Sequence, residues 1–296
     1  MKNGFTWPKT SVYWREGDAS FASIPFTWEL KKVRRFIRSR PGKWTVGGPA
    51  IFLMPDYFQD LPDVSVKWSW GGILQRHNPY ATRTTRGCPN KCKYCAIGSG
   101  KIERGAFIEK GEWPDRPILC DNNLLAASER HLQRVFDRLR WWGWADFNQG
   151  LDCRLVTPEI AKEIHSIGKP IVRVSLDSWS VAPVWEYAVN LFLDAGVAKR
   201  RMHSYVMIGW GDDPRRDIER VEYAKTILGP GSVNAMWFHE LDAMKPNVVT
   251  EKQAACGWTD RLRIDTMRWS YGRGPKPDIL RLTTGDSANA DSTNAS

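Results

Sequence analysis

Residues 84–95 read TTRGCPNKCKYC and place three cysteines, Cys88, Cys92 and Cys95, within eight residues in CxxxCxxC spacing. The run overlaps the end of an apolar segment, residues 80–85, that we expect to be a strand, so the thiols are predicted on the loop that leaves its carboxyl end. Thiolates are soft ligands suited to iron–sulfur clusters or zinc, and a cubane normally takes four of them. Three thiols leave one iron with an open position where a substrate can bind.

The chain beyond this loop alternates between short apolar segments and amphipathic ones, which is typical of a parallel sheet with crossover helices. The expected strands are residues 80–85, 117–121, 145–149, 171–176, 203–208 and 233–238. The expected helices are residues 126–142, a helix that starts at Pro158, and residues 184–195 and 216–228. Because six such units do not complete an eight-stranded barrel, the sequence predicts an open, partial (β/α)6 barrel with its chemistry at the carboxyl ends of the strands.

The barrel is expected over residues 77–243, between a small α/β region at residues 1–76 and a substrate-side segment at residues 244–283. In residues 1–76, the apolar pattern predicts a strand at residues 21–26, a helix at residues 29–38 and a strand that ends at Val46. Residues 284–296, TGDSANADSTNAS, have no apolar periodicity and are expected to be disordered.

Composition sets outer limits on function. With 296 residues, 42% of them hydrophobic, the chain can bury a substantial core. It has no apolar run near the roughly 20 residues that span a bilayer and begins without the apolar stretch of a secretion signal, so we expect a cytoplasmic protein and no membrane partner. The net charge of +10 favours an anionic partner such as RNA or DNA, although it also serves solubility. The basic helix at residues 29–38 predicts a solvated face first and a nucleic-acid-binding face second.

Cysteines in this spacing, with the aromatic Tyr94 before the last of them and after the first strand of a βα-repeat chain, resemble the signature of the radical S-adenosylmethionine (SAM) superfamily. The resemblance covers roughly residues 80–240. It implies a [4Fe-4S] cluster held by the three cysteines, whose open iron binds the amino and carboxylate groups of SAM and passes one electron to its sulfonium. Cleavage then gives methionine and a 5′-deoxyadenosyl radical that removes a hydrogen atom from the substrate. An electron donor of the flavodoxin or ferredoxin type is implied as a partner.

The resemblance also implies SAM contacts at individual positions. Tyr94 is expected to pack by the adenine, and Arg154 is suited to a carboxylate of SAM or of the substrate, with a surface ion pair as the alternative. The second strand ends in a polar run, Asp121-Asn122-Asn123, where the family commonly has a GGE-like segment that hydrogen-bonds the SAM amino group. The glycines of that segment are missing here. A helix N-cap is the alternative role for Asn122 or Asn123. The residues after the fourth strand are the expected contacts of the SAM ribose. The fifth strand is similar to a GxIxGxxE region, in which a backbone strand pairs with adenine. The first glycine of that pattern is absent here, and its acidic end is shifted. The residues so assigned are Asp121, Asn122, Asn123, Asp177, Ser178, Ile208 and Gly209.

The region before the barrel ends a strand in Val46-Gly47-Gly48-Pro49, which is weakly similar to the last part of the cobalamin-binding domain of related radical SAM proteins. Residues 1–76 contain no histidine, so the DxHxxG ligand motif is absent and we assign no cobalamin. The region is interpreted as a reduced relic of that domain or as an unrelated cap.

Three further cysteines stand alone. Cys120 and Cys153 lie at the ends of predicted strands near the expected SAM pocket, where either could contact the cofactor, with packing as the default. Cys256 is expected to be a buried free cysteine, with a catalytic thiol as the alternative.

Two classes of function stay open. The first is a radical SAM enzyme on an unidentified substrate, with RNA or tRNA slightly ahead of peptides and small molecules because of the charge and the 16 tryptophans. The second is a non-catalytic nucleic-acid-binding protein stabilised by zinc or an iron–sulfur cluster, with His77 or His131 as the fourth ligand of a Cys3His zinc site.

Overall fold

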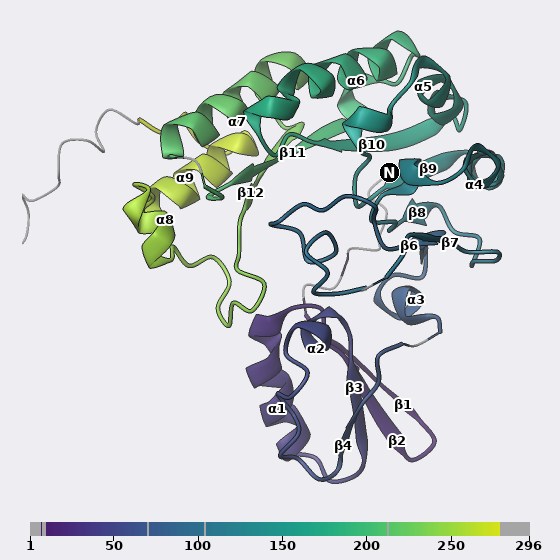
Figure 1. The fold of residues 1–296 in the computed structure, drawn as a ribbon, viewed down its shortest axis with the longest axis vertical. Coiled ribbons are helices and arrows are strands. Elements are labelled where there is room, and N and C mark those ends of the chain that lie inside the picture. Colours follow the sequence, from purple (N-terminus) through teal and green to yellow (C-terminus); the bar gives the residue numbers. More distant parts are fainter. Residues whose placement is uncertain (1–6, 8–9, 70, 104, 212, 279–296) are drawn as a thin grey trace, which may run out of the picture. The chain divides into compact units, whose positions relative to one another are not determined.

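The computed structural model describes residues 7, 10–69, 71–103, 105–211 and 213–278 (Figure 1). The chain divides into two compact units. The first comprises residues 1–175, 183–203 and 239–247, and the second comprises residues 176–182, 204–238 and 248–296. The expected disordered segment, residues 284–296, lies outside the described residues.

The first unit begins with a four-stranded sheet in the order β1-β2-β3-β4 (Figure 1). The strands are β1 (Val12–Glu16), β2 (Ala19–Ser23), β3 (Trp44–Gly47) and β4 (Val64–Val66). β1 and β2 form an antiparallel hairpin, whereas β2, β3 and β4 pair in parallel. The sequence did not indicate β1, because its polar residues hide the alternation, and it placed β2 too late. Pro25 cannot donate to a ladder, so the predicted strand at residues 21–26 does not continue through it.

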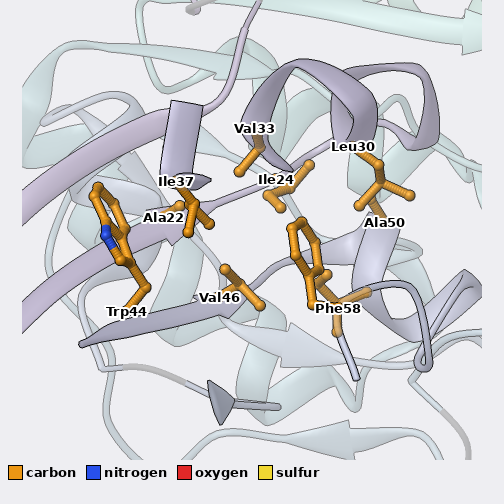
Figure 2. Packing of buried hydrophobic residues seen from close by; sticks show 10 residues of the cluster. Ala22, Ile24, Leu30, Val33, Ile37, Trp44, Val46, Ala50 and Phe58 are labelled. Carbon is orange, nitrogen blue, oxygen red and sulfur yellow. The ribbon is translucent and has the colours of Figure 1, made fainter. Parts of the chain in front are cut away.

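The helix after β2 covers this sheet. A 3-10 turn, η1 (Thr27–Glu29), leads into α1 (Leu30–Arg38), and α2 (Pro49–Leu53) follows β3. Leu30, Val33 and Ile37 of α1 belong to one buried cluster with Ala22 and Val46 of the strands, which Figure 2 shows. Their spacing of three and four residues brings them to one face of the helix, so the basic residues of α1 fall on its other faces. Lys31, Lys32, Arg35 and Arg38 are exposed there.

The rest of the first unit holds a parallel ladder in the order β5-β8-β9-β10. Its strands are β5 (Ala81–Thr82), β8 (Ile118–Leu119), β9 (Trp144–Phe147) and β10 (Lys169–Ser175), and each neighbouring pair is parallel. A separate antiparallel pair consists of β6 (Thr85–Arg86) and β7 (Ile108–Glu109). The helices are α3 (Ile73–His77), α4 (Glu129–Trp142), α5 (Pro158–His165) and nearly all of α6 (Ala182–Asp194). Thr157 caps α5 and accepts a hydrogen bond from the amide of Ile160, so the predicted start of this helix at Pro158 is confirmed.

The second unit contains most of β11 (Met202–Ile208) and β12 (Val233–Trp237), which pair in parallel. Its helices are α7 (Pro214–Leu228), α8 (Glu251–Ala255) and α9 (Asp260–Ser270). Asp213 begins α7 by accepting a hydrogen bond from the amide of Arg216 at 3.0 Å.

All six strands predicted after residue 77 are present, and α4, α5, α6 and α7 connect them from β8 onward, so the prediction of an α/β fold with parallel strands is confirmed. The first strand is shorter than expected, because residues 85–86 leave the ladder and pair with β7 instead, and the second ends at Leu119. Closure into a partial barrel and the three predicted domain boundaries stay predictions. Within the described ranges no helix has both the length and the apolar character needed to cross a bilayer.

Candidate metal centre at the cysteine loop

The three cysteines lie on a tightly wound segment after β6, residues 87–100, which we call the cysteine loop. The amide of Cys95 donates to the carbonyl of Cys92 at 3.1 Å, and the amide of Ser99 donates to the carbonyl of Cys95 at 2.8 Å. Gly98 closes the loop: a Cβ at this position would lie 2.6 Å from the Cys92 nitrogen and 2.8 Å from the Cys92 oxygen. Both contacts are with backbone, so no other residue fits at position 98 without opening the loop.

The thiols of Cys88, Cys92 and Cys95 are half-buried, and none forms a disulfide. Burial is the largest influence on Cys92 and raises its pKa, and the neighbouring thiols of Cys95 and Cys88 raise it further. A hydrogen bond from the Tyr94 side chain and the charge of Arg154 act in the opposite direction. The three sulfurs therefore lie close enough to influence one another, with one cation beside them.

Within the part of the chain that the structure describes, no group of three or more His, Cys, Asp or Glu side chains is placed to hold one metal ion. A cubane binds each thiolate through a different iron, so its ligands lie farther apart than those of one zinc ion. Three soft thiol donors on one loop fit an iron–sulfur cluster in their chemistry.

The two histidines considered for a Cys3His zinc site have other partners. His77 Nε2 lies 2.9 Å from Ser23 Oγ. His131 is buried, with Nε2 3.1 Å from Thr84 Oγ1 and Nδ1 3.8 Å from a carboxylate oxygen of Glu109. Both ring nitrogens of His131 thus have other partners, as does Nε2 of His77, and a zinc site completed by either histidine stays a prediction.

A first carboxylate, Glu103, contacts the start of the cysteine loop. It accepts hydrogen bonds from the Gly87 amide at 3.0 Å and from Asn122 Nδ2 at 2.7 Å, and it pairs with the guanidinium of Arg83. Burial alone would raise the pKa of Glu103, but the Arg83 charge and these hydrogen bonds outweigh it and lower the pKa. Glu103 is therefore ionised at neutral pH.

A second carboxylate, Asp152, contacts the middle of the same loop. Its Oδ2 accepts from Asn90 Nδ2 at 2.8 Å and from Asn123 Nδ2 at 3.1 Å. Arg154, in the 3-10 turn η3 (Cys153–Leu155), forms a bidentate pair with it, at 2.8 Å for each oxygen. Burial would again raise the pKa, but the hydrogen bonds from Arg154 and Asn90 lower the pKa of Asp152.

These contacts show where the residues assigned to SAM in the first unit lie. Asn122 donates a hydrogen bond to Glu103, and Asn123 donates one to Asp152. Arg154 forms an ion pair with Asp152, which was the alternative to a contact with SAM or substrate. Asp121 is buried, and its Oδ1 accepts from the amides and hydroxyls of Thr84 and Thr85. It therefore fixes the start of β6. Contacts of these residues and of Tyr94 with SAM stay predictions.

The other assigned residues lie in the second unit. The carbonyl of Ile208 accepts from the Phe238 amide at 2.9 Å. Gly209 donates its amide to Asp217 Oδ2 at 2.7 Å and accepts from Gln253 Nε2 at 3.0 Å. Asp177 is half-buried before η4 (Trp179–Val181), and Ser178 Oγ lies 2.7 Å from Ser180 Oγ. Their role in binding SAM stays a prediction.

The solitary cysteines differ from one another. Cys120 and Cys153 are buried, and burial raises the pKa of Cys120 to about 12, so it is a neutral thiol at physiological pH. Cys256 is exposed, at the end of α8, so the expectation of a buried thiol there is wrong. Its place at a helix end, outside the packed face of α8, explains the difference.

Sequence reasoning missed Gly98, Glu103 and Asp152 as parts of the site. Gly98, three residues after the last cysteine, gave a local signal, since a glycine beside a ligand loop often marks a close backbone approach. The two acidic residues carry no local signature, because only the fold brings them to the loop.

Comparisons with known proteins give distant structural likenesses. No family model matches the chain, and no curated protein does. Among solved structures, the radical SAM methyltransferase TsrM from Kitasatospora setae, with cobalamin and a [4Fe-4S] cluster bound, aligns at a TM-score of 0.48 and 12% identity, over 72% of this chain and 60% of that one. The same enzyme with tryptophan and a SAM analogue bound aligns at 0.46 and 12% identity, over 72% and 58%. The chain thus spans about three fifths of these proteins, and a likeness this distant assigns no activity.

Proposed function

We propose that the chain is a radical SAM enzyme in which Cys88, Cys92 and Cys95 hold a [4Fe-4S] cluster with one iron open to SAM. The proposal is supported most by the position of the cysteine loop. Its hydrogen bonds, through Glu103 and Asp152, connect it to Asn122 and Asn123, which follow β8, and Asp152 itself lies on the segment after β9. The loop therefore lies at the carboxyl ends of parallel strands, where α/β folds place their chemistry.

When bound, the cluster would supply the electron that cleaves SAM and starts radical chemistry on the substrate. The chain's own residues provide the surroundings. Half-burial of the three thiols limits the access of water to the metal, and Arg154 places a positive charge beside Cys92. A side-chain hydrogen bond with Tyr94 acts to lower the pKa of Cys92.

We propose RNA as the substrate class and a flavodoxin- or ferredoxin-type protein as the electron donor. The net charge of +10 supports an anionic substrate, as do the exposed cations on α1, which include Lys31, Lys32 and Arg35.

Anaerobic reconstitution with iron and sulfide tests the proposal. The wild type is expected to turn brown and to release 5′-deoxyadenosine from SAM under dithionite. Cys92→Ala is expected to lose bound iron and this release, because one iron then lacks its ligand. Cys256→Ala, which removes an exposed thiol outside the loop, is the matched control and is expected to behave as the wild type. A colourless wild type that carries one zinc ion would overturn the proposal, as would full activity in Cys92→Ala.

A further inference from the structure

Two consecutive asparagines at the end of β8 each bind a different carboxylate of the site. Asn122 donates to Glu103, and Asn123 donates to Asp152. Both asparagines lie in the non-helical segment between β8 and the 3-10 turn η2 (Leu124–Ala126), and their side chains reach two different carboxylates.

Each carboxylate in turn holds one part of the cysteine loop. Glu103 accepts the amide of Gly87, the residue before Cys88, and Asp152 accepts the side chain of Asn90, which lies between Cys88 and Cys92. The backbone before Cys88 and the segment between Cys88 and Cys92 are thus each linked, through one carboxylate, to an asparagine that follows β8. Side-chain exposure is only 15% for Glu103 and 10% for Asp152, so these hydrogen bonds are largely shielded from water.

The backbone at Glu103 supports a specific role for this side chain. Its φ is +51°, a left-handed conformation that is unfavourable for residues other than glycine. Neighbouring contacts have to offset that cost. The three partners of Glu103, namely Arg83, Gly87 and Asn122, are the contacts that do so.

We infer that Glu103 and Asp152 are positioning residues that, with Asn122 and Asn123, fix the cysteine loop at the strand ends and so preorganise the thiols for the cluster. The inference rests on the proposed function as far as the cluster is concerned. The order that it assigns to the loop is a property of the metal-free chain as well. Residues that orient metal ligands from outside typically contribute 10–100-fold to metal affinity.

Glu103→Gln and Asp152→Asn test this inference, since each keeps the size of the side chain and removes its charge. In the metal-free protein, backbone amides of residues 87–100 are expected to exchange hydrogen at least about tenfold faster than in the wild type. In the reconstituted protein, a chelator is expected to remove iron about tenfold faster. Asp152→Asn is also expected to raise the midpoint potential of the cluster, because the charge of Arg154 beside Cys92 then lacks its counter-ion.

Glu163→Gln is the matched control, because Glu163 pairs with Arg140 in the same unit and neither contacts the loop. Asn90→Ala gives an independent test, since it removes only the hydrogen bond from the loop to Asp152 and keeps both carboxylates. In the double variant Asn90→Ala/Asp152→Asn, the amides of the cysteine loop should exchange no faster than in Asp152→Asn alone. Unchanged loop exchange in Glu103→Gln, Asp152→Asn and Asn90→Ala would overturn the inference, even if the cluster forms. A wild type that never binds a cluster would overturn the proposed function. Hydrogen exchange of the cysteine loop in the metal-free variants would still test whether Glu103 and Asp152 position that loop.

Discussion

Replacing Gly98 by alanine is expected to prevent assembly of the cluster while leaving the rest of the chain folded. The added Cβ would lie 2.6 Å from the nitrogen of Cys92 and 3.1 Å from the carbonyl oxygen of Asn90. Because both neighbours are backbone atoms, the loop would have to open, and Cys92 would move away from Cys88 and Cys95. Iron and sulfide bound per chain after reconstitution are expected to fall at least roughly tenfold, as for other losses of ligand placement.

Gly111→Ala is the control for Gly98→Ala. A Cβ at Gly111 meets nothing within 4 Å, and neither glycine has a positive φ, so the two substitutions differ in steric contact alone. Gly111→Ala should bind iron as the wild type does. Wild-type iron content in Gly98→Ala would show that the thiols do not depend on the close winding of the loop.

Asp217→Ala is expected to lower the free energy of unfolding by about 3–5 kcal/mol, the usual cost of leaving one member of a buried ion pair alone. Asp217 and Arg220 of α7 are both almost fully buried, and their carboxylate and guanidinium lie 2.6 Å apart. Asp217 also accepts the amide of Gly209, and Arg220 donates to the carbonyl of Met207, so the pair braces the end of β11. Urea denaturation followed by circular dichroism measures the loss.

Asp265→Ala is the matched control for Asp217→Ala, because Asp265 pairs with the exposed Arg261 on α9. Removing a surface pair should change stability by less than about 1 kcal/mol. Adding Arg220→Ala to Asp217→Ala should cost less than the sum of the two single losses, since no unpaired charge stays buried. Equal stability losses in Asp217→Ala and Asp265→Ala would contradict a buried, coupled pair.

The order of strands and helices could be predicted because each element carries its own periodicity. α4 shows Leu132, Val135, Phe136 and Leu139 on one buried face, and α5 carries both Thr157 as its cap and Pro158 at its first position. Element ends were less predictable. β8 ends at Leu119, two residues earlier than expected, because the side chain of Asp121 binds the backbone of Thr84 and Thr85 and thereby turns the chain toward β6.

The site was only half visible in the sequence. The spacing of Cys88, Cys92 and Cys95 is local and needs no fold to be recognised. Glu103 and Asp152 come from different segments, and nothing around them indicates that they meet at the cysteine loop. The resemblance to radical SAM enzymes implies SAM contacts for Asn122 and Asn123, whereas the structure gives each of them a carboxylate partner.

An electron paramagnetic resonance spectrum of the reduced, reconstituted protein, recorded before and after SAM is added, tests most directly whether a cluster with an open iron is present. Binding of the SAM amino and carboxylate groups to that iron should change the spectrum of the cluster, and S-adenosylhomocysteine, which lacks the sulfonium methyl, serves as the comparison ligand. A [4Fe-4S] signal that shifts with SAM is the expected result. An iron–sulfur signal that SAM leaves unchanged, or the absence of any such signal from the wild type, would contradict it.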